Sequence, residues 1–161
     1  MKQIHILIFF FALAIQLSAQ NKVIKTYENG TTYIEGNTVE GIYNENDEYI
    51  NGVSDTPIQL GEKVLLKDGK WTFYYENGNI QAVTYFEKGK RTGTWKSYHT
   101  NKQISSEENY DTGEAVYYLS NGKKFQEGKI TKLGLKHGKW KFWDEKGNLI
   151  EKTYNNGLEV K

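Results

Sequence analysis

Residues 69–89 read GKWTFYYENGNIQAVTYFEKG, and this stretch is the first of four related segments in the chain. Each segment starts with glycine, has Trp two positions later in three cases of four, an aromatic residue at the fifth position after the glycine and a turn at the ninth. The starts are Gly69, Gly93, Gly113 and Gly138, spaced by 24, 20 and 25 residues. A period of this length indicates a repeat protein, whose short units bury their apolar faces only by stacking on neighbours.

Each unit contains two stretches that favour β-strands, separated by a turn. In the first unit these are residues 71–75 and 80–86, and neither has the three-to-four-residue apolar spacing of a helix. The turns fall at Asn77-Gly78, Asn101-Lys102, Asn121-Gly122 and Lys146-Gly147. We expect tight primed turns at the two Asn-Gly pairs, because both central positions of such a turn need positive φ. The predicted fold is therefore all-β, an extended antiparallel meander of tandem hairpins.

Alternation along the strands assigns the aromatic residues to two faces of the sheet. The structural repeat positions are Gly69, Trp71, Gly78, Gly93, Trp95, Gly113, Gly122, Gly138, Trp140 and Gly147. We expect the tryptophans to form a core seam on one face with Phe73, Tyr117 and Phe142, and the glycines to serve as turns and as bare backbone on which aromatic rings lie. The opposite face carries what we call the aromatic ladder: Tyr74, Tyr98, Tyr118 and Trp143. A single-layer sheet cannot hide both faces, so we predict the ladder to be the binding site.

The chain divides into three parts. Residues 1–20 have one early Lys, an apolar run of about a dozen residues and small residues at the end, which is typical of a cleavable signal helix. Residues 21–66 are expected to be one or two degenerate units with an irregular connection, because 30–36 matches 122–128 at both glycines, an aromatic and a Glu. Gly41-Ile42-Tyr43 could open a further strand. Residues 67–161 hold the four regular units.

Charge and composition limit the kinds of partner that the protein can bind. Cleavage after Ala19 or Gln20 leaves 20 basic and 20 acidic residues, so no basic excess is present to bind nucleic acid. There is no cysteine in the chain, which excludes disulfides, thiolate chemistry and a lipid anchor on cysteine. We expect an exported protein, periplasmic or extracellular, with no membrane segment after cleavage.

The pattern Gly-x-Trp-x-Phe-Tyr followed by Asn-Gly, an aliphatic residue, Tyr and Gly, seen in 69–89 and 138–157, resembles the bacterial variant of the MORN repeat. The third unit departs from the pattern, with Ala115 for Trp and Lys124 for the aliphatic residue. The resemblance implies an extended sheet of hairpins and no particular reaction. Similar proteins are often labelled antitoxin components of toxin-antitoxin pairs, a label at odds with an export signal.

The sequence gives little support for a catalytic site or a metal-binding site. A Ser-His-Asp arrangement of His99 or His137 with Ser97, Ser105 or Asp111 stays open, but no nucleophile-elbow motif accompanies it, and we favour loop or solvent-facing histidines. Glu107 and Glu108 are adjacent, so they face opposite sides of a strand. Asn44, Asn46 and Glu48 alternate like calcium ligands but lack the glycine and the closing Glu of such a loop. We expect no enzyme, cofactor or metal.

The sequence favours a secreted, non-enzymatic scaffold that binds another protein through its aromatic face. A glycan-binding protein of the cell envelope is the alternative, because exposed Tyr and Trp rings stack on sugars and anchor proteins equally well. An antitoxin role is a third hypothesis, conditional on the absence of export. Free sheet edges also allow self-association by strand addition.

Overall fold

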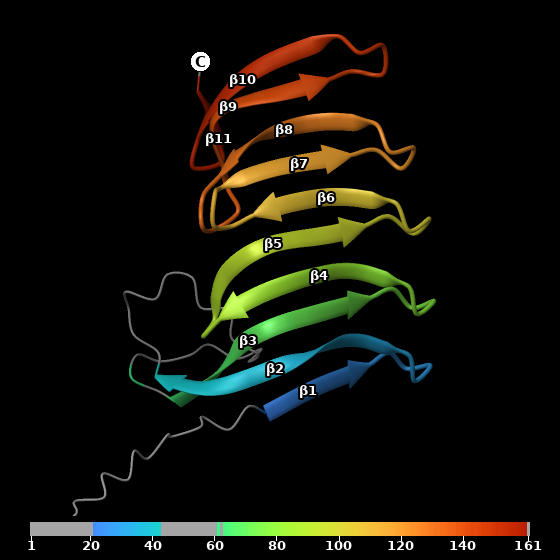
Figure 1. Cartoon of the computed structure of the whole chain (residues 1–161), viewed down its shortest axis with the longest axis vertical. Helices are drawn as coiled ribbons and strands as arrows, with labels where there is room; N and C mark the ends of the chain where they lie inside the picture. The colour runs from blue at the N-terminus through green and yellow to red at the C-terminus, as the bar shows by residue number, and fades with distance from the viewer. Residues whose placement is uncertain (1–20, 43–60, 62, 161) are drawn as a thin grey trace, which may run out of the picture.

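The computed structural model describes residues 21–42, 61 and 63–160, and in these ranges the chain forms one antiparallel sheet. Its strands are β1 (Asn21–Thr26), β2 (Thr32–Ile42), β3 (Lys63–Tyr74), β4 (Ile80–Glu87), β5 (Lys90–Tyr98), β6 (Ile104–Asn109), β7 (Glu114–Tyr118), β8 (Lys124–Ile130), β9 (Lys136–Trp143), β10 (Leu149–Asn155) and β11 (Leu158–Val160). Each strand pairs with its neighbours in sequence, so the predicted all-β meander of hairpins is confirmed (Figure 1).

Some predictions fall outside the described residues. These are the signal helix of 1–20, the calcium-like residues Asn44, Asn46 and Glu48, and most of the irregular connection expected at 54–62. The degenerate N-terminal unit is visible as the hairpin β1–β2. Gly41 and Ile42 do not open a strand as expected; they are the last residues of β2, where they pair with Val64 and Lys63.

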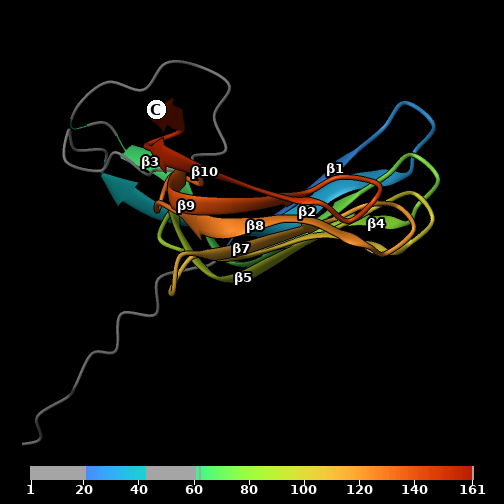
Figure 2. The same ribbon diagram turned by 90° about the horizontal axis from the view of Figure 1, so that it is seen from above.

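The sheet is a single layer whose strands curl at one edge, where β2 ends and β3 begins (Figure 2). Val39, Val64 and Leu66 form a small buried cluster in this curled part. Among the described residues no second layer covers either face, so a large side chain there can be buried only by groups of its own face. This constraint decides how the tryptophans pack.

Each hairpin loop that follows β1, β3, β5, β7 and β9 is closed by the same two backbone hydrogen bonds. The first residue donates to the carbonyl of the fifth, and the fourth donates to the carbonyl of the first; in 75–79 these bonds are 2.8 and 2.9 Å. Only the fourth residue has positive φ. The primed turns expected at Asn77-Gly78 and Asn121-Gly122 are therefore wrong. The Asn side chain explains this, because its oxygen accepts a bond from the N–H two residues later, which fixes the Asn in the loop.

The primed turns lie instead at the other edge of the sheet. Lys88-Gly89 joins β4 to β5 and Asn156-Gly157 joins β10 to β11, and all four residues have positive φ. Two-residue loops of this kind match the strand twist. The tightest turns thus follow β4 and β10, the return strands of hairpin units.

Trp71 and Trp140 are fully buried, at 0% exposure, although the sheet has one layer. Each indole lies flat on a glycine of the preceding strand: an added Cβ would stand 2.2 Å from the Trp71 ring at Gly36 and 2.5 Å from the Trp140 ring at Gly128. Each indole N–H donates to the next carbonyl along that strand, at 2.9 and 2.8 Å. The expectation that glycine provides bare backbone for aromatic rings is confirmed at these two positions.

The outer side of each indole is covered by a cation two residues before the repeat glycine. The Lys67 ammonium lies 5.2 Å from the Trp71 ring, and the Lys136 ammonium lies 4.5 Å from the Trp140 ring. Burial is the largest cause that lowers the pKa of both ammonium groups from the ordinary value. The lysine stem supplies apolar cover while its charge stays over the π face.

The second unit shows the same arrangement in a weaker form. Trp95 donates to the Tyr85 carbonyl at 2.9 Å, and the Arg91 guanidinium lies 4.9 Å over the ring. We call the residue on which the indole lies the platform position. In this unit the platform position holds Thr84 instead of glycine, and the Thr84 hydroxyl is buried without a hydrogen-bond partner. Trp95 is only half-buried. The degree of Trp burial therefore follows whether the neighbouring strand offers glycine.

We predict that Gly128→Ala lowers the free energy of unfolding by about 2 to 4 kcal/mol, since the new methyl group must displace the Trp140 ring from its position. Chemical denaturation measures the loss. Lys129→Ala, at the next and largely exposed position, is the control and should change stability by less than about 0.5 kcal/mol. Equal effects of the two substitutions would contradict the packing described.

We also predict that Lys102→Gly stabilises the protein by up to about 1 kcal/mol. Lys102 occupies the positive-φ position, at φ 70°, that glycine holds in the other hairpin loops. Gly78→Ala, the reverse change at the equivalent position, should destabilise. Thermal unfolding of both variants checks the pair, and a loss of stability in Lys102→Gly would contradict the account.

Candidate functional site

The four ladder residues lie at the ends of β3, β5, β7 and β9, and all are half-buried. Each pairs with the first residue of the following strand, which places both side chains on one face: the partners are Ile80, Ile104, Lys124 and Leu149. Ile80 is 43% exposed and Leu149 is 50% exposed. Together the ladder and these partners form a row across eight strands, which we call the ladder stripe. At the usual strand spacing it is about 34 Å long.

A row of charged and β-branched residues, which we call the charged row, runs beside the ladder stripe on the same face. The strand registers connect Glu35, Thr72, Val83, Lys96, Glu107, Val116, Glu127, Lys141 and Glu151. Its members bond one another and the ladder. Lys96 pairs with Glu107 at 2.7 Å, and Lys124 of the stripe pairs with Glu127 at 2.7 Å. Hydrogen bonds to these carboxylates are the largest cause that raises the pKa of both lysines.

Carboxylates of this row also orient the ladder rings. The Tyr74 hydroxyl donates to Glu35, and this hydrogen bond is the largest cause that raises the pKa of Tyr74. The Tyr118 hydroxyl lies 3.5 Å from a Glu107 oxygen. Lys124 extends over Trp143, with its nitrogen 5.7 Å from the ring centre. The ladder is thus held in place by polar neighbours, with ring surface left open.

Side chains also link successive hairpin loops. The first loop residue donates to the last carbonyl of the following hairpin's outgoing strand: Tyr27 to the Tyr74 carbonyl at 2.9 Å, and Tyr75 to the Tyr98 carbonyl at 2.7 Å. His99 makes the equivalent bond to the Tyr118 carbonyl at 2.8 Å through Nε2. The next residue in this series is Leu119, which has no polar side-chain atom.

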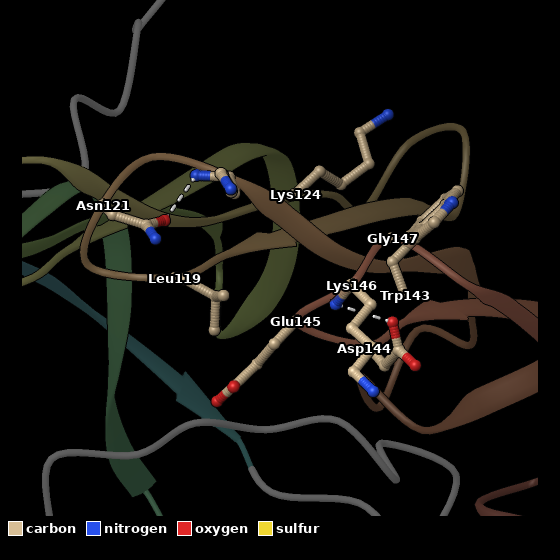
Figure 3. A pocket seen from close by; sticks show the side chains of 9 residues that line it. Leu119, Asn121, Lys124, Trp143, Asp144, Glu145, Lys146 and Gly147 are labelled. Carbon is tan, nitrogen blue, oxygen red and sulfur yellow. Dashed lines mark hydrogen bonds between the residues drawn. The ribbon is translucent and has the colours of Figure 1, made fainter.

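A pocket of about 620 Å³ opens at this break in the series, between the loops 119–123 and 144–148. Leu119 and Trp143 come from the two hairpins that border it (Figure 3). Lys123, Lys124 and Lys146 supply positive charge in the lining, and Asp144 and Glu145 supply negative charge. The end of the ladder stripe at Trp143 is therefore also the rim of a pocket.

The candidate catalytic residues have other partners. His99 fixes the loop as described, and Asp111 accepts a 3.0 Å bond from the backbone N–H of Gly93. Glu107 and Glu108 face opposite sides, as predicted: Glu107 pairs with Lys96, while Glu108 bonds Tyr110 and Tyr117. In the described ranges, no group of three His, Asp or Glu side chains is placed to hold a metal ion.

The third unit replaces the tryptophan by a polar cluster that sequence reasoning missed. Ala115 stands in the Trp position, and Glu108 occupies the facing platform position. The Glu108 carboxylate accepts bonds from Tyr110 at 2.8 Å and Tyr117 at 2.7 Å. Tyr110 is 1% exposed, and its hydroxyl accepts a 2.8 Å hydrogen bond from the Arg91 guanidinium. Its ring packs on Trp95, with 4.5 Å between the two ring centres. The sequence does carry a signal for this cluster. The unit with Ala115 in place of Trp also has Glu108 in place of the platform glycine, and Asp111 in place of the cation two residues before the repeat glycine.

The comparison with protein families agrees with this geometry. A family model described as MORN repeat variant matches residues 67–88, 91–112 and 136–156. The chain carries MORN repeats. The unmatched unit between the second and third MORN segments is the one with Ala115, yet its strands β7 and β8 pair in the same way. No curated protein and no solved structure matches the chain significantly.

MORN repeats are generally modules for interaction with proteins or membranes. Within residues 21–42, 61 and 63–160, no helix has the length and apolar character needed to cross a membrane. MORN repeats and a continuous ladder stripe together favour binding through the sheet surface.

The Glu108 cluster predicts a loss of stability at alkaline pH. Burial and then Glu108 raise the pKa of Tyr110 and Tyr117 above the ordinary 10.0, so the folded state holds these protons more tightly than the unfolded state. Their contribution is full below about pH 10 and is lost as the pH rises toward the folded pKa values. Denaturation between pH 8 and 11.5 should show the decline, and the double variant Tyr110→Phe/Tyr117→Phe should show a shallower one. An identical slope in both proteins would contradict this assignment.

Proposed function

We propose that this protein is an exported, non-enzymatic MORN-repeat scaffold that binds a partner protein through the ladder stripe. The observation that supports it most is the register that aligns Tyr74, Tyr98, Tyr118 and Trp143 on one face, each beside an aliphatic or basic residue of the next strand. Large rings that are already held in place lose little conformational entropy on binding, so they make effective interface anchors. The leader-like residues 1–20 support export.

The adjacent charged row favours a protein partner. It contains both Lys96 and Lys141 and the carboxylates of Glu107, Glu127 and Glu151, so it presents both signs of charge along the stripe. Apolar anchors flanked by charges of both signs suit a folded protein surface, where complementary charges set orientation and register. A polyanion such as nucleic acid would require a basic excess, which the sequence lacks.

The test is affinity capture from the exported fraction with the full protein and with the double variant Tyr98→Ala/Trp143→Ala. We predict that one protein is retained by the wild type and that its affinity falls at least about a hundredfold in the variant, because two of the four aromatic anchors are lost. Leu158→Ala on β11 removes a more exposed apolar side chain, 76% exposed, away from the stripe and should bind normally. Unchanged capture by the double variant would refute the proposal.

The glycan alternative has a separate readout. Trp71 and Trp140 are fully buried, whereas Trp143 lies in the stripe, so stacking of a sugar on the stripe should quench chiefly Trp143 fluorescence. A polysaccharide that quenches the wild type but not Trp143→Phe would favour this alternative over a protein partner. A reporter fused to residues 1–20 tests export directly, and its retention in the cytoplasm would favour an antitoxin role.

A further inference from the structure

The pocket beside Trp143 exists because one link in a repeated series is missing. In the first three gaps between hairpin loops, the side chain of Tyr27, Tyr75 or His99 spans the gap and donates to a backbone carbonyl of the next hairpin. In the fourth gap the corresponding carbonyl is that of Trp143, and Leu119 can neither fill the same volume nor donate. The chain thus shows, three times over, which chemical group fits this place.

The two backbone hydrogen bonds that close each hairpin loop are also present on both sides of the fourth gap, although β9 and β10 pair without the register shift of the other hairpins with such loops. Leu119 donates to the Lys123 carbonyl at 2.8 Å and accepts from Gly122 at 2.8 Å, and Asp144 makes the equivalent bonds at 3.1 and 3.0 Å. The loop 144–148 is stiffened further, because the Asp144 carboxylate accepts bonds from the N–H groups of Lys146 and Asn148. The walls of the pocket are therefore formed in advance.

We infer that this pocket receives a phenolic ring, a tyrosine side chain of the partner protein, whose hydroxyl donates to the Trp143 carbonyl and whose ring packs against Leu119. This inference rests on the proposed function, because the pocket is continuous with the end of the ladder stripe at Trp143. Tyrosine is favoured over a purely apolar ring because two of the three internal precedents are tyrosines and the third is an imidazole. A benzene ring could not donate a hydrogen bond to this carbonyl.

The binding test uses N-acetyltyrosinamide as a probe and N-acetylphenylalaninamide as its matched control, titrated into the isotope-labelled protein. We expect amide signals of the loops 119–123 and 144–148 to shift, while those of the loop 27–31, whose gap to the next loop is filled by Tyr27, stay in place. The tyrosine probe should bind roughly three- to tenfold more tightly, the net value of one neutral hydrogen bond. Equal affinity of the two probes, or shifts outside these two loops only, would overturn the inference.

Leu119→Tyr supplies the missing ring from the chain itself. It should abolish the probe-induced shifts and raise the melting temperature by roughly 2 to 4 °C, because the fourth link of the series is restored. Leu119→Ala leaves the pocket open but removes the apolar contact to the ring, so it should bind the probe more weakly than the wild type does and still show shifts in the two loops. Leu119→His, which copies the side chain of His99, repeats the test with a smaller ring if the tyrosine variant folds poorly. Probe binding that persists in a folded Tyr or His variant would overturn the inference.

Capture of the partner separates this inference from the proposed function. If Tyr98→Ala and Leu119→Tyr both weaken the partner, both statements stand. If Tyr98→Ala weakens it and Leu119→Tyr does not, the pocket assignment is overturned and the stripe stands. If neither variant weakens it, the proposed function fails, whatever the probe does at the pocket.

Discussion

The structure depends on a tryptophan that lies between a glycine backbone and a cationic side chain. A single-layer sheet offers no second layer, so burial of a large ring must come from its own face. Trp71 and Trp140 reach complete burial because Gly36 and Gly128 let the indole touch the backbone and because a lysine covers the outer side. Each contact joins two consecutive hairpins, which holds the repeat array together.

Within each repeat, the residue at the Trp position, the platform residue and the covering residue change together. Where the platform residue is Thr84, Trp95 is less buried; where the tryptophan is Ala115, the platform becomes Glu108 and the covering position becomes Asp111. Tyr110 packs beside Ala115, where the other units have an indole, and its hydroxyl forms hydrogen bonds with Glu108 and Arg91. A polar cluster with satisfied hydrogen bonds can replace an apolar contact at little net cost, whereas one unpaired partner would be expensive. The unit with this substitution is also the one that the MORN model does not match.

Much of the fold could be predicted from the sequence, because the fixed positions of Gly69, Trp71 and Gly78 in each unit specify strand, face and loop together. The turn type at Asn77 could not, since Asn fits both a primed turn and a loop in which its side chain bonds the backbone, and the choice depends on the strands that meet there. The ladder was predicted as a row from alternation alone. The pocket was not, because a missing hydrogen bond at Leu119 has meaning only beside the bonds made by its equivalents.

Hydrogen exchange of the four indole N–H groups, followed by NMR, tests the central packing interaction most directly. Trp71, Trp95 and Trp140 donate to backbone carbonyls of the preceding strand, at 2.9, 2.9 and 2.8 Å, whereas Trp143 lies on the opposite, open face. This packing predicts slow exchange for Trp71 and Trp140, intermediate exchange for Trp95 and fast exchange for Trp143. Similar exchange rates for all four, or slower exchange for Trp143 than for Trp140, would contradict it.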